Sequence, residues 1–208
     1  MNYEWRIVIY LLLLHQKSML ELHDVIIKPR QQTFSLMVED GKLACISGPQ
    51  GSGKTSVLRA IMGLLPIDSG HISIDGELLT PRSAPYFRRH MAYVPSRLMP
   101  IPGQDTVDDV RRLLFSLRSS GTKQQEGGAD GRRWSALTLT EQYLELLTCA
   151  AQLQRSIVLV DQPPCELDDA AVSDVLSLLQ RMTDAGASVV VVSNSYHIKM
   201  NSQTLIEF

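Results

Sequence analysis

Short apolar runs recur along the chain and predict the strands of a sheet. The clearest run, residues 157–160, reads Ile-Val-Leu-Val without a polar interruption. A continuous apolar run of this length is typical of a strand that is buried on both faces of a parallel sheet. Residues 71–76 instead alternate between apolar and polar side chains, as one arm of a hairpin does. The same reasoning predicts strands at residues 20–27, 33–38, 43–47, 91–94 and 189–192.

Apolar residues at spacings of three and four positions predict helices between these strands. One helix begins at Lys54 and is expected to continue until Pro66 stops it. Further helical patterns cover residues 107–117, 139–153 and 172–182. The polar, glycine-containing tract 118–133 is expected to be a mobile surface loop. Alternating strands and helices predict an α/β fold with a mostly parallel sheet and a helical insertion near residues 105–153.

A glycine-rich motif lies between the predicted strand 43–47 and the helix that begins at Lys54. It fits the phosphate-loop pattern G-x-x-x-x-G-K-S/T without a mismatch, and Ser56 follows it. The motif consists of Gly48, Pro49, Gln50, Gly51, Ser52, Gly53, Lys54 and Thr55. Successive backbone N–H groups and the positive end of the helix dipole suit a phosphate. Because the strand, the loop and the helix occur in the required order, the sequence predicts binding of a nucleoside triphosphate, foremost Mg-ATP.

Asp161 is the candidate acidic partner of this loop. It follows the buried run 157–160, and strand ends of an open parallel sheet face the ligand crevice. We expect this strand to lie beside the phosphate loop, with the Thr55 hydroxyl and the Asp161 carboxylate as ligands of Mg²⁺. Lys54 is expected to contact the β- and γ-phosphates. The alternative is a turn or helix-capping aspartate before Pro163.

Length and composition favour one domain that is not directed to nucleic acid. With 208 residues, 44% of them hydrophobic, the chain is long enough for one packed domain. The formal net charge of -2 is spread over interspersed acids and bases, so no basic face indicates a nucleic-acid partner. Cys45, Cys149 and Cys165 lack metal-ligand spacing, which favours reduced thiols in a cytoplasmic protein.

The N-terminal residues are the one apparent targeting feature. Residues 5–14 are largely apolar, but this run is too short for a bilayer span, which needs about 20 apolar residues. A signal peptide would carry its positive charge before the run and a small-residue cleavage site after it. Residues 1–18 are therefore expected to be a flexible leader or an over-long start, and the domain to cover residues 19–208.

The order of these landmarks resembles the ATP-binding cassette proteins, which are the nucleotide-binding subunits of ABC transporters. Residues 69–76, Ser-Gly-His-Ile-Ser-Ile-Asp-Gly, are similar to the hairpin that follows the family's first helix. Residues 93–95 resemble the approach to its Q-loop, and residues 165–168 occupy the place of its D-loop. The resemblance implies a P-loop NTPase with a RecA-like parallel core, an antiparallel β subdomain, and a helical subdomain at about residues 97–153.

The resemblance also implies partners. Members of the family form head-to-tail dimers that enclose ATP, so this chain is expected to pair with itself or with a paralogous ATP-binding subunit. Asp168, in the D-loop, would contact the second subunit. An integral membrane subunit is a further expected partner, which would hold the chain at the inner face of a membrane through the helical subdomain.

Several positions depart from the family pattern. Gln162 replaces the catalytic glutamate after Asp161, and a neutral amide cannot take a proton. Asn194 stands at the position of the switch histidine, although His197 follows three residues later. Ser96 replaces the Q-loop glutamine and is a further candidate ligand of Mg²⁺. Gln162 and Asn194 are therefore degenerate catalytic positions, and we expect hydrolysis to be impaired.

Two further departures concern contacts with ATP. The family signature L-S-G-G-Q is replaced by residues 137–141, Leu-Thr-Leu-Thr-Glu, so side chains stand where two glycines allow close approach to a γ-phosphate. Thr138 and Glu141 also fit a capping box that starts a helix. Residues 26–28, Ile-Ile-Lys, occupy the region where an aromatic residue would stack on adenine.

Three functions remain open at this point. The first is an Mg-ATP-binding subunit of an ABC-type transporter or related assembly with impaired hydrolysis. The second is an active ATPase in which Gln162 positions the attacking water. The third is a nucleotide-gated interaction module outside transport.

Overall fold

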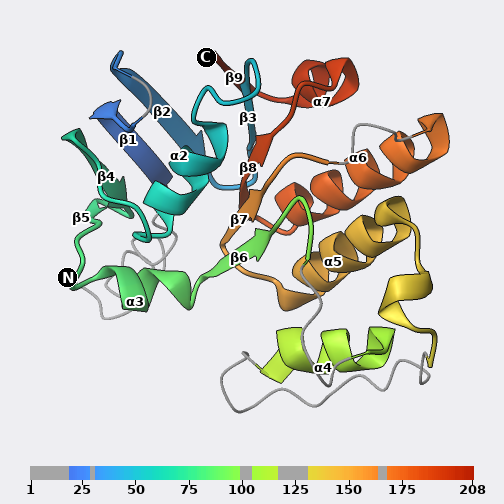
Figure 1. Cartoon of the computed structure of the whole chain (residues 1–208). Coiled ribbons are helices and arrows are strands. Elements are labelled where there is room, and N and C mark those ends of the chain that lie inside the picture. The colour runs from blue at the N-terminus through green and yellow to red at the C-terminus, as the bar shows by residue number, and fades with distance from the viewer. Residues whose placement is uncertain (1–18, 29–30, 99–104, 117–130, 164–167) are drawn as a thin grey trace, which may run out of the picture.

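The computed structural model describes residues 19–28, 31–98, 105–116, 131–163 and 168–208 (Figure 1). The predictions for residues 1–18, for residues 118–130 of the polar tract, and for residues 165–167 of the D-loop lie outside the described residues.

Two sheets form the molecule. The parallel sheet has the strand order β6-β7-β8-β3-β9, and the antiparallel sheet has the order β2-β1-β4-β5. The parallel strands are β6 (Met91–Val94), β7 (Ile157–Val160), β8 (Ser188–Val192), β3 (Leu43–Ser47) and β9 (Thr204–Glu207). The antiparallel strands are β2 (Phe34–Glu39), β1 (Met19–Ile26), β4 (Ser69–Ile74) and β5 (Glu77–Leu78). This arrangement confirms the predicted α/β fold of a P-loop NTPase with an antiparallel β subdomain.

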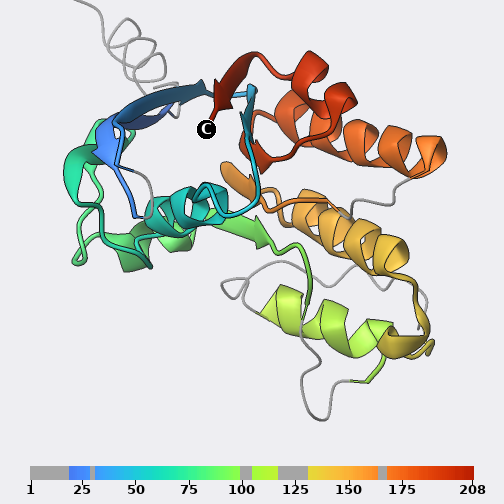
Figure 2. The same ribbon diagram turned by 45° about the horizontal axis from the view of Figure 1, so that its top comes forward.

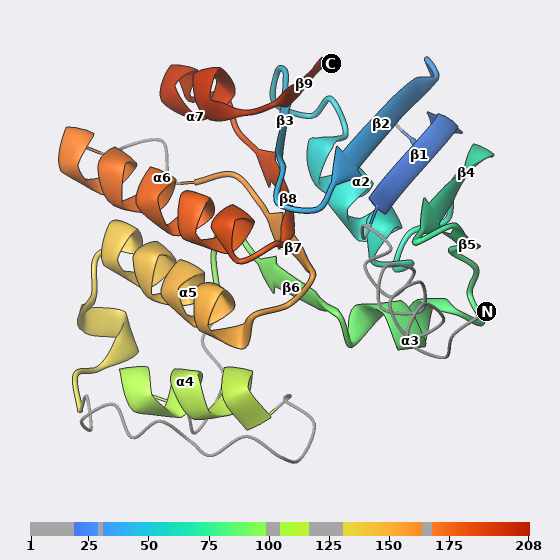
Figure 3. The ribbon, with the colours of Figure 1, turned by 180° about the vertical axis from the view of Figure 1, so that it is seen from behind.

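Helices cover both faces of the parallel sheet. The helices are α2 (Lys54–Ile61), α3 (Ala84–Arg88), α4 (Val107–Ser116), α5 (Leu139–Leu153), α6 (Asp169–Asp184) and α7 (Tyr196–Asn201), with a 3-10 turn η1 at Trp134–Ala136. Figure 2 shows α5 and α6 side by side on one side of the sheet, and Figure 3 shows α4 outside α5, away from the strands. No described helix is long and apolar enough to cross a bilayer.

The alternation of side chains along the parallel strands divides the core into two clusters. Within β3, Ala44 and Ile46 pack with α2 and the antiparallel sheet. The intervening Cys45 faces the other cluster, which α5 and α6 fill with residues such as Leu147 and Leu179. Because successive side chains of a strand point to opposite faces, a fully apolar strand is needed to serve both clusters. The uninterrupted apolar runs in the sequence arise because both faces of these central strands are buried.

The helix that begins at Lys54 is shorter than predicted, because it ends at Ile61 and does not reach Pro66. The chain leaves the helix through Gly63, which has φ +64°. The N–H of Leu64 donates to the carbonyl of Arg59 at 2.9 Å, and the N–H of Gly63 donates to that of Ala60 at 2.8 Å. These two bonds form a Schellman motif, which ends a helix at a left-handed residue before any proline is needed.

The last elements of the chain were not predicted. The helix α7 is short and mostly exposed, so it lacks an extended apolar period. The strand β9 is the edge of the sheet, where it pairs with β3 in parallel. Its exposed Leu205 and half-buried Ile206 give a weaker pattern than that of the central strands. In contrast, β6, β7 and α5 have the predicted bounds.

Candidate phosphate-binding site

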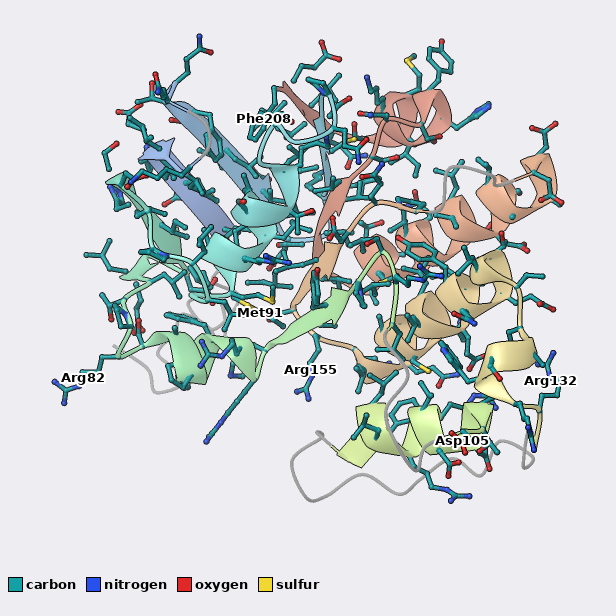
Figure 4. All side chains as sticks on the ribbon, in the orientation of Figure 1. Arg82, Met91, Asp105, Arg132, Arg155 and Phe208 are labelled. Atoms are coloured by element: carbon teal, nitrogen blue, oxygen red, sulfur yellow. The ribbon has the colours of Figure 1, made fainter. Side chains whose placement is uncertain are left out.

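The glycine-rich loop leaves the end of the buried strand β3 under close steric constraint. At Gly48, which has φ +144°, an added Cβ would lie 2.7 Å from the carbonyl oxygen of Phe208. The N–H of Phe208 donates to the carbonyl of Ser47 at 2.9 Å. Figure 4 shows Phe208 beside this loop. Glycine at position 48 is therefore required both by the backbone conformation and by the nearness of Phe208.

The loop then turns into the N-terminus of α2. Gly51 has φ +80° and Gly53 has φ +96°, conformations that L side chains rarely adopt. Lys54 begins α2, and the first turn of this helix contains no acidic residue. The unpaired N–H groups of a first turn and the positive dipole end attract an anion. The local structure thus fits the predicted phosphate site.

Lys54 places its charge at this loop. Its Nζ donates to the carbonyl oxygens of Gly48 at 2.8 Å and Pro49 at 2.6 Å. The side chain is buried, and this burial lowers its pKa, while the nearby carboxylate of Asp161 acts in the opposite direction. An ammonium group held by loop carbonyls is well placed to meet an anion bound on the loop N–H groups.

Thr55 and Asp161 meet, although they are 106 positions apart in the sequence. The Thr55 hydroxyl lies 3.0 Å from Asp161 Oδ1 and 3.2 Å from Oδ2. The Asp161 side chain is buried. A hydroxyl and a carboxylate are hard oxygen donors, and Mg²⁺ is bound in proteins by one or two carboxylates together with phosphate oxygens. The donor set therefore fits Mg²⁺ beside a bound phosphate.

The strand that carries Asp161 does not neighbour the phosphate-loop strand, so the prediction of adjacent strands was wrong. β8 lies between β3 and β7 in the sheet. Asp161 still reaches Thr55 because all three strands are parallel and end at the same edge, where α2 starts. The insertion of β8 also brings the residues that follow it to this edge.

Asn194 is the residue that β8 brings to the phosphate loop. Its Oδ1 accepts hydrogen bonds from the Ser47 hydroxyl at 3.0 Å and from the N–H of Gly48 at 3.1 Å. The sequence identified Asn194 as a degenerate catalytic position but gave no sign of this anchoring contact. His197 lies exposed on α7 and forms no hydrogen bond to loop residues 48–55, all of which the structure describes.

Two tyrosines that the sequence analysis did not assign to the site contact Asp161. The Tyr93 hydroxyl donates to Asp161 Oδ2 at 3.2 Å, and the Tyr143 hydroxyl donates to the Asp161 backbone carbonyl at 3.2 Å. Burial and the nearby carboxylate raise the pKa of Tyr93 to about 12, and burial raises that of Tyr143 further. In the sequence, Tyr143 lies within a predicted helix, and Tyr93 stands only in the segment that resembles the approach to the Q-loop, so neither was marked as a partner of Asp161.

The structure does not bring the other candidate residues into this network. Ser96 is exposed and forms no hydrogen bond to Thr55 or Asp161. Gln162 is half-buried directly after Asp161 and makes no hydrogen bond with the described residues. Ser56 lies half-buried in the first turn of α2. Gln50 and Ser52 belong to the loop and form no hydrogen bond to Asp161, although the Ser52 hydroxyl accepts from Lys54 Nζ at 3.5 Å.

The signature region starts a helix, as the capping-box pattern predicted. Thr138 is the N-cap of α5, and its hydroxyl accepts from the N–H of Glu141 at 3.2 Å. The Glu141 carboxylate in turn accepts from the N–H of Thr138 at 2.7 Å, which lowers the pKa of Glu141. Leu139, which stands where the family signature has glycine, is 51% exposed, so its side chain projects from the surface at this helix start.

Asp168, at the D-loop position, and residues 27–28, in the region expected to contact adenine, have local structural roles. Asp168 caps α6, because its carboxylate accepts from the N–H of Ala171 at 2.7 Å. Ile27 is buried in the core, and the exposed Lys28 lies 3.5 Å from Asp68. The described part of the region expected to contact adenine thus has no aromatic side chain.

Comparison with known proteins connects this site to one family. The family described as ABC transporter matches residues 31–196. The manganese transport system ATP-binding protein MntB of Listeria innocua is 29% identical over 180 residues, which are 78% of this chain and 73% of that protein. MntB of Bacillus subtilis is 30% identical over 182 residues, 79% of this chain and 71% of that protein.

Solved structures show the same fold. A structure described as the ATP binding subunit of an ABC transporter superposes with a TM-score of 0.77 and 18% identity, over 91% of this chain and 85% of that one. A dimeric ATP-binding cassette with ADP and phosphate gives a TM-score of 0.74 at 20% identity, over 91% of this chain and 94% of that one.

Proposed function

The chain belongs to the ABC transporter family, and on that premise we propose that it is an Mg-ATP-binding subunit of an ABC-type transport system with impaired hydrolysis. The observation that carries the binding proposal is the meeting of Thr55 and Asp161 beside Lys54. The loop supplies backbone donors for phosphate, Lys54 supplies a cation, and Thr55 with Asp161 supplies oxygen ligands for Mg²⁺. Bound Mg²⁺ would neutralise phosphate charge at this edge of the sheet.

The proposal of impaired hydrolysis rests on two residues. Gln162 follows Asp161, and its neutral amide cannot act as a general base toward water. Asn194 directs its carbonyl oxygen to Ser47 and Gly48, so this oxygen is already used within the protein. Neither side chain supplies the acid–base chemistry of a glutamate or a histidine.

We further propose that the chain works as a dimer, with itself or with a paralogous subunit, and docks on an integral membrane subunit at its cytoplasmic face. The MntB relatives are described as ATP-binding proteins of transport systems, and a structural neighbour is a dimer. The names of similar proteins range from a manganese transport system to vitamin B12 import, so they do not converge on one cargo.

A thermal melt with ATP and Mg²⁺ tests the binding proposal. Ligand that binds only the folded state stabilises it by RT ln(1 + [L]/Kd), which is about 2.7 kcal/mol at a hundredfold excess over Kd. We expect this shift in the wild type and its loss in Lys54→Ala, because Lys54 is the cation of the loop. Lys42→Ala is the matched control, since Lys42 is an exposed lysine in the turn before β3. A wild-type melting temperature that does not change with Mg-ATP would refute the proposal.

Phosphate release at saturating Mg-ATP tests the proposal of impaired hydrolysis. Loss of a positioned base lowers a rate by 10²- to 10⁴-fold, and typical enzymes turn over at about 10 s⁻¹, so we expect roughly 0.1 s⁻¹ or less. Gln162→Glu alone should restore little, and its combination with Asn194→His should restore more than the two single changes together. Wild-type turnover of several per second that disappears in Lys54→Ala would favour water positioning by Gln162.

A further inference from the structure

Asp161 is held from a third element besides its own strand and α2. Strand β6 pairs with β7 in parallel, and the N–H of Asp161 donates to the carbonyl of Val94 at 2.8 Å. One residue before Val94, Tyr93 reaches the same edge of the sheet and donates its hydroxyl to Asp161 Oδ2 at 3.2 Å. The backbone and the side chain of Asp161 are thus both attached to β6.

We propose that Tyr93 is a positioning residue for Mg²⁺ binding, which holds the Asp161 carboxylate in the orientation that meets Thr55. This inference rests on the proposed function, because it assigns a role within the same Mg-ATP site. Tyr93 would not touch the metal and would act through Asp161. Ser96, which the family resemblance made a further candidate ligand of Mg²⁺, forms no hydrogen bond to Asp161, so the support from the β6 segment comes from Tyr93.

The local chemistry suits a fixed donor. Asp161 is only 4% exposed, so its carboxylate depends on protein donors, and within the described residues these are the Thr55 and Tyr93 hydroxyls. A tyrosine phenol carries one O–H donor, and the Tyr93 hydroxyl directs it to Asp161 Oδ2. A partner that orients a metal-ligating side chain is typically worth 10- to 100-fold in metal affinity.

Tyr143 provides a matched control, because it is a second tyrosine that bonds to Asp161. Its hydroxyl also donates to Asp161 at 3.2 Å, but to the backbone carbonyl and not to the carboxylate. Tyr143→Phe removes a buried tyrosine hydroxyl next to Asp161 and leaves both carboxylate contacts intact. Tyr86→Phe is a second control, because Tyr86 is 59% exposed on α3.

The test is calorimetric titration of the full chain with ATP, first in EDTA and then over a series of Mg²⁺ concentrations. For Tyr93→Phe we expect the half-saturating Mg²⁺ concentration to rise 10- to 100-fold, with ATP affinity in EDTA within about twofold of wild type. For Tyr143→Phe and Tyr86→Phe we expect no change in the half-saturating Mg²⁺ concentration. Urea titrations of all variants establish that each is folded at the titration temperature.

The outcomes separate this inference from the proposed function. If wild type binds no ATP with or without Mg²⁺, the proposed function fails and the inference fails with it. If wild type shows Mg²⁺-dependent binding that Tyr93→Phe leaves unchanged, only the inference is overturned. Equal losses of ATP affinity in EDTA and in Mg²⁺ would assign Tyr93 a purely structural role, and so would an equal Mg²⁺ effect in Tyr143→Phe.

Discussion

Truncation of Asn194 to alanine is expected to loosen the phosphate loop. Asn194 Oδ1 is the acceptor for both the Ser47 hydroxyl and the N–H of Gly48. Ser47 is 2% exposed, so water does not readily replace the lost acceptor at its hydroxyl. Asn194 is itself exposed, which limits what each bond contributes. The change removes the direct tie between the end of β8 and the start of the loop.

The expected magnitude follows from the two bonds. An intramolecular hydrogen bond contributes about 0.5–1.5 kcal/mol, so Asn194→Ala should lower the free energy of unfolding by about 1–3 kcal/mol. For a chain of this size, each kcal/mol lowers Tm by about 2–4 °C. Mg-ATP should also bind more weakly, because binding must then order a loop that wild type already holds in place.

Urea titration and Mg-ATP calorimetry measure these two effects. Asn194→Asp is the informative companion, because it keeps an acceptor oxygen and should retain most of the stability. Its added negative charge should nevertheless weaken the binding of ATP phosphates. Asn201→Ala is the control on α7, where the lost bond is one exposed contact to the His197 carbonyl. An Asn194→Ala variant as stable as wild type, with unchanged Mg-ATP affinity, would contradict the anchoring role.

Three further predictions concern the rest of the chain. Thr138→Ala should cost about 1 kcal/mol at neutral pH by removing the N-cap of α5. The bonds to Thr138 lower the pKa of Glu141 in the folded state. The stability that this pair contributes is therefore present above the unfolded pKa and is lost as pH falls through the folded pKa. Urea titrations should accordingly show a smaller difference between variant and wild type at pH 3 than at pH 7. Leu147→Ala should destabilise by about 2–5 kcal/mol in the same assay, because this fully buried side chain would leave a cavity between α5 and the sheet. Cys45 and Cys149 should resist alkylation of the native protein at pH 8 and react after unfolding, since burial raises their pKa values to about 11 and about 12; rapid native labelling would contradict their burial.

The sequence was most informative where a local pattern determines the structure. The bounds of β7 and α5 follow from an uninterrupted apolar run and from a capping box, and both are local signals. The end of α2 was misplaced because Gly63 stops the helix earlier than Pro66, and two stop signals in one segment do not show which acts first. The edge strand β9 was missed because its half-exposed side chains give little contrast.

At the site, the sequence predicted the residues but not the order of the strands that carry them. The motif at residues 48–55 and the carboxylate of Asp161 were predictable because each is marked by its neighbours in the sequence. The strand order was not predictable from these marks, since an apolar strand can take any interior place in a parallel sheet. Adjacency of β3 and β7 was accordingly assumed, and the structure places β8 between them.

This strand order gives Asn194 and Tyr93 their roles. With β8 next to β3, the residue two positions after β8 lies beside the start of the phosphate loop, and Asn194 bonds to Gly48 there. With β6 on the far side of β7, Tyr93 reaches the carboxylate of Asp161 from the opposite direction. A change at Asn194 should therefore act on the loop with or without Mg²⁺, whereas a change at Tyr93 should act only when Mg²⁺ is present. ATP titrations in EDTA and in Mg²⁺ should distinguish the two variants. Asn194 accepts from the Ser47 hydroxyl and from the N–H of Gly48 at the start of the loop, whereas Tyr93 donates to the proposed metal ligand.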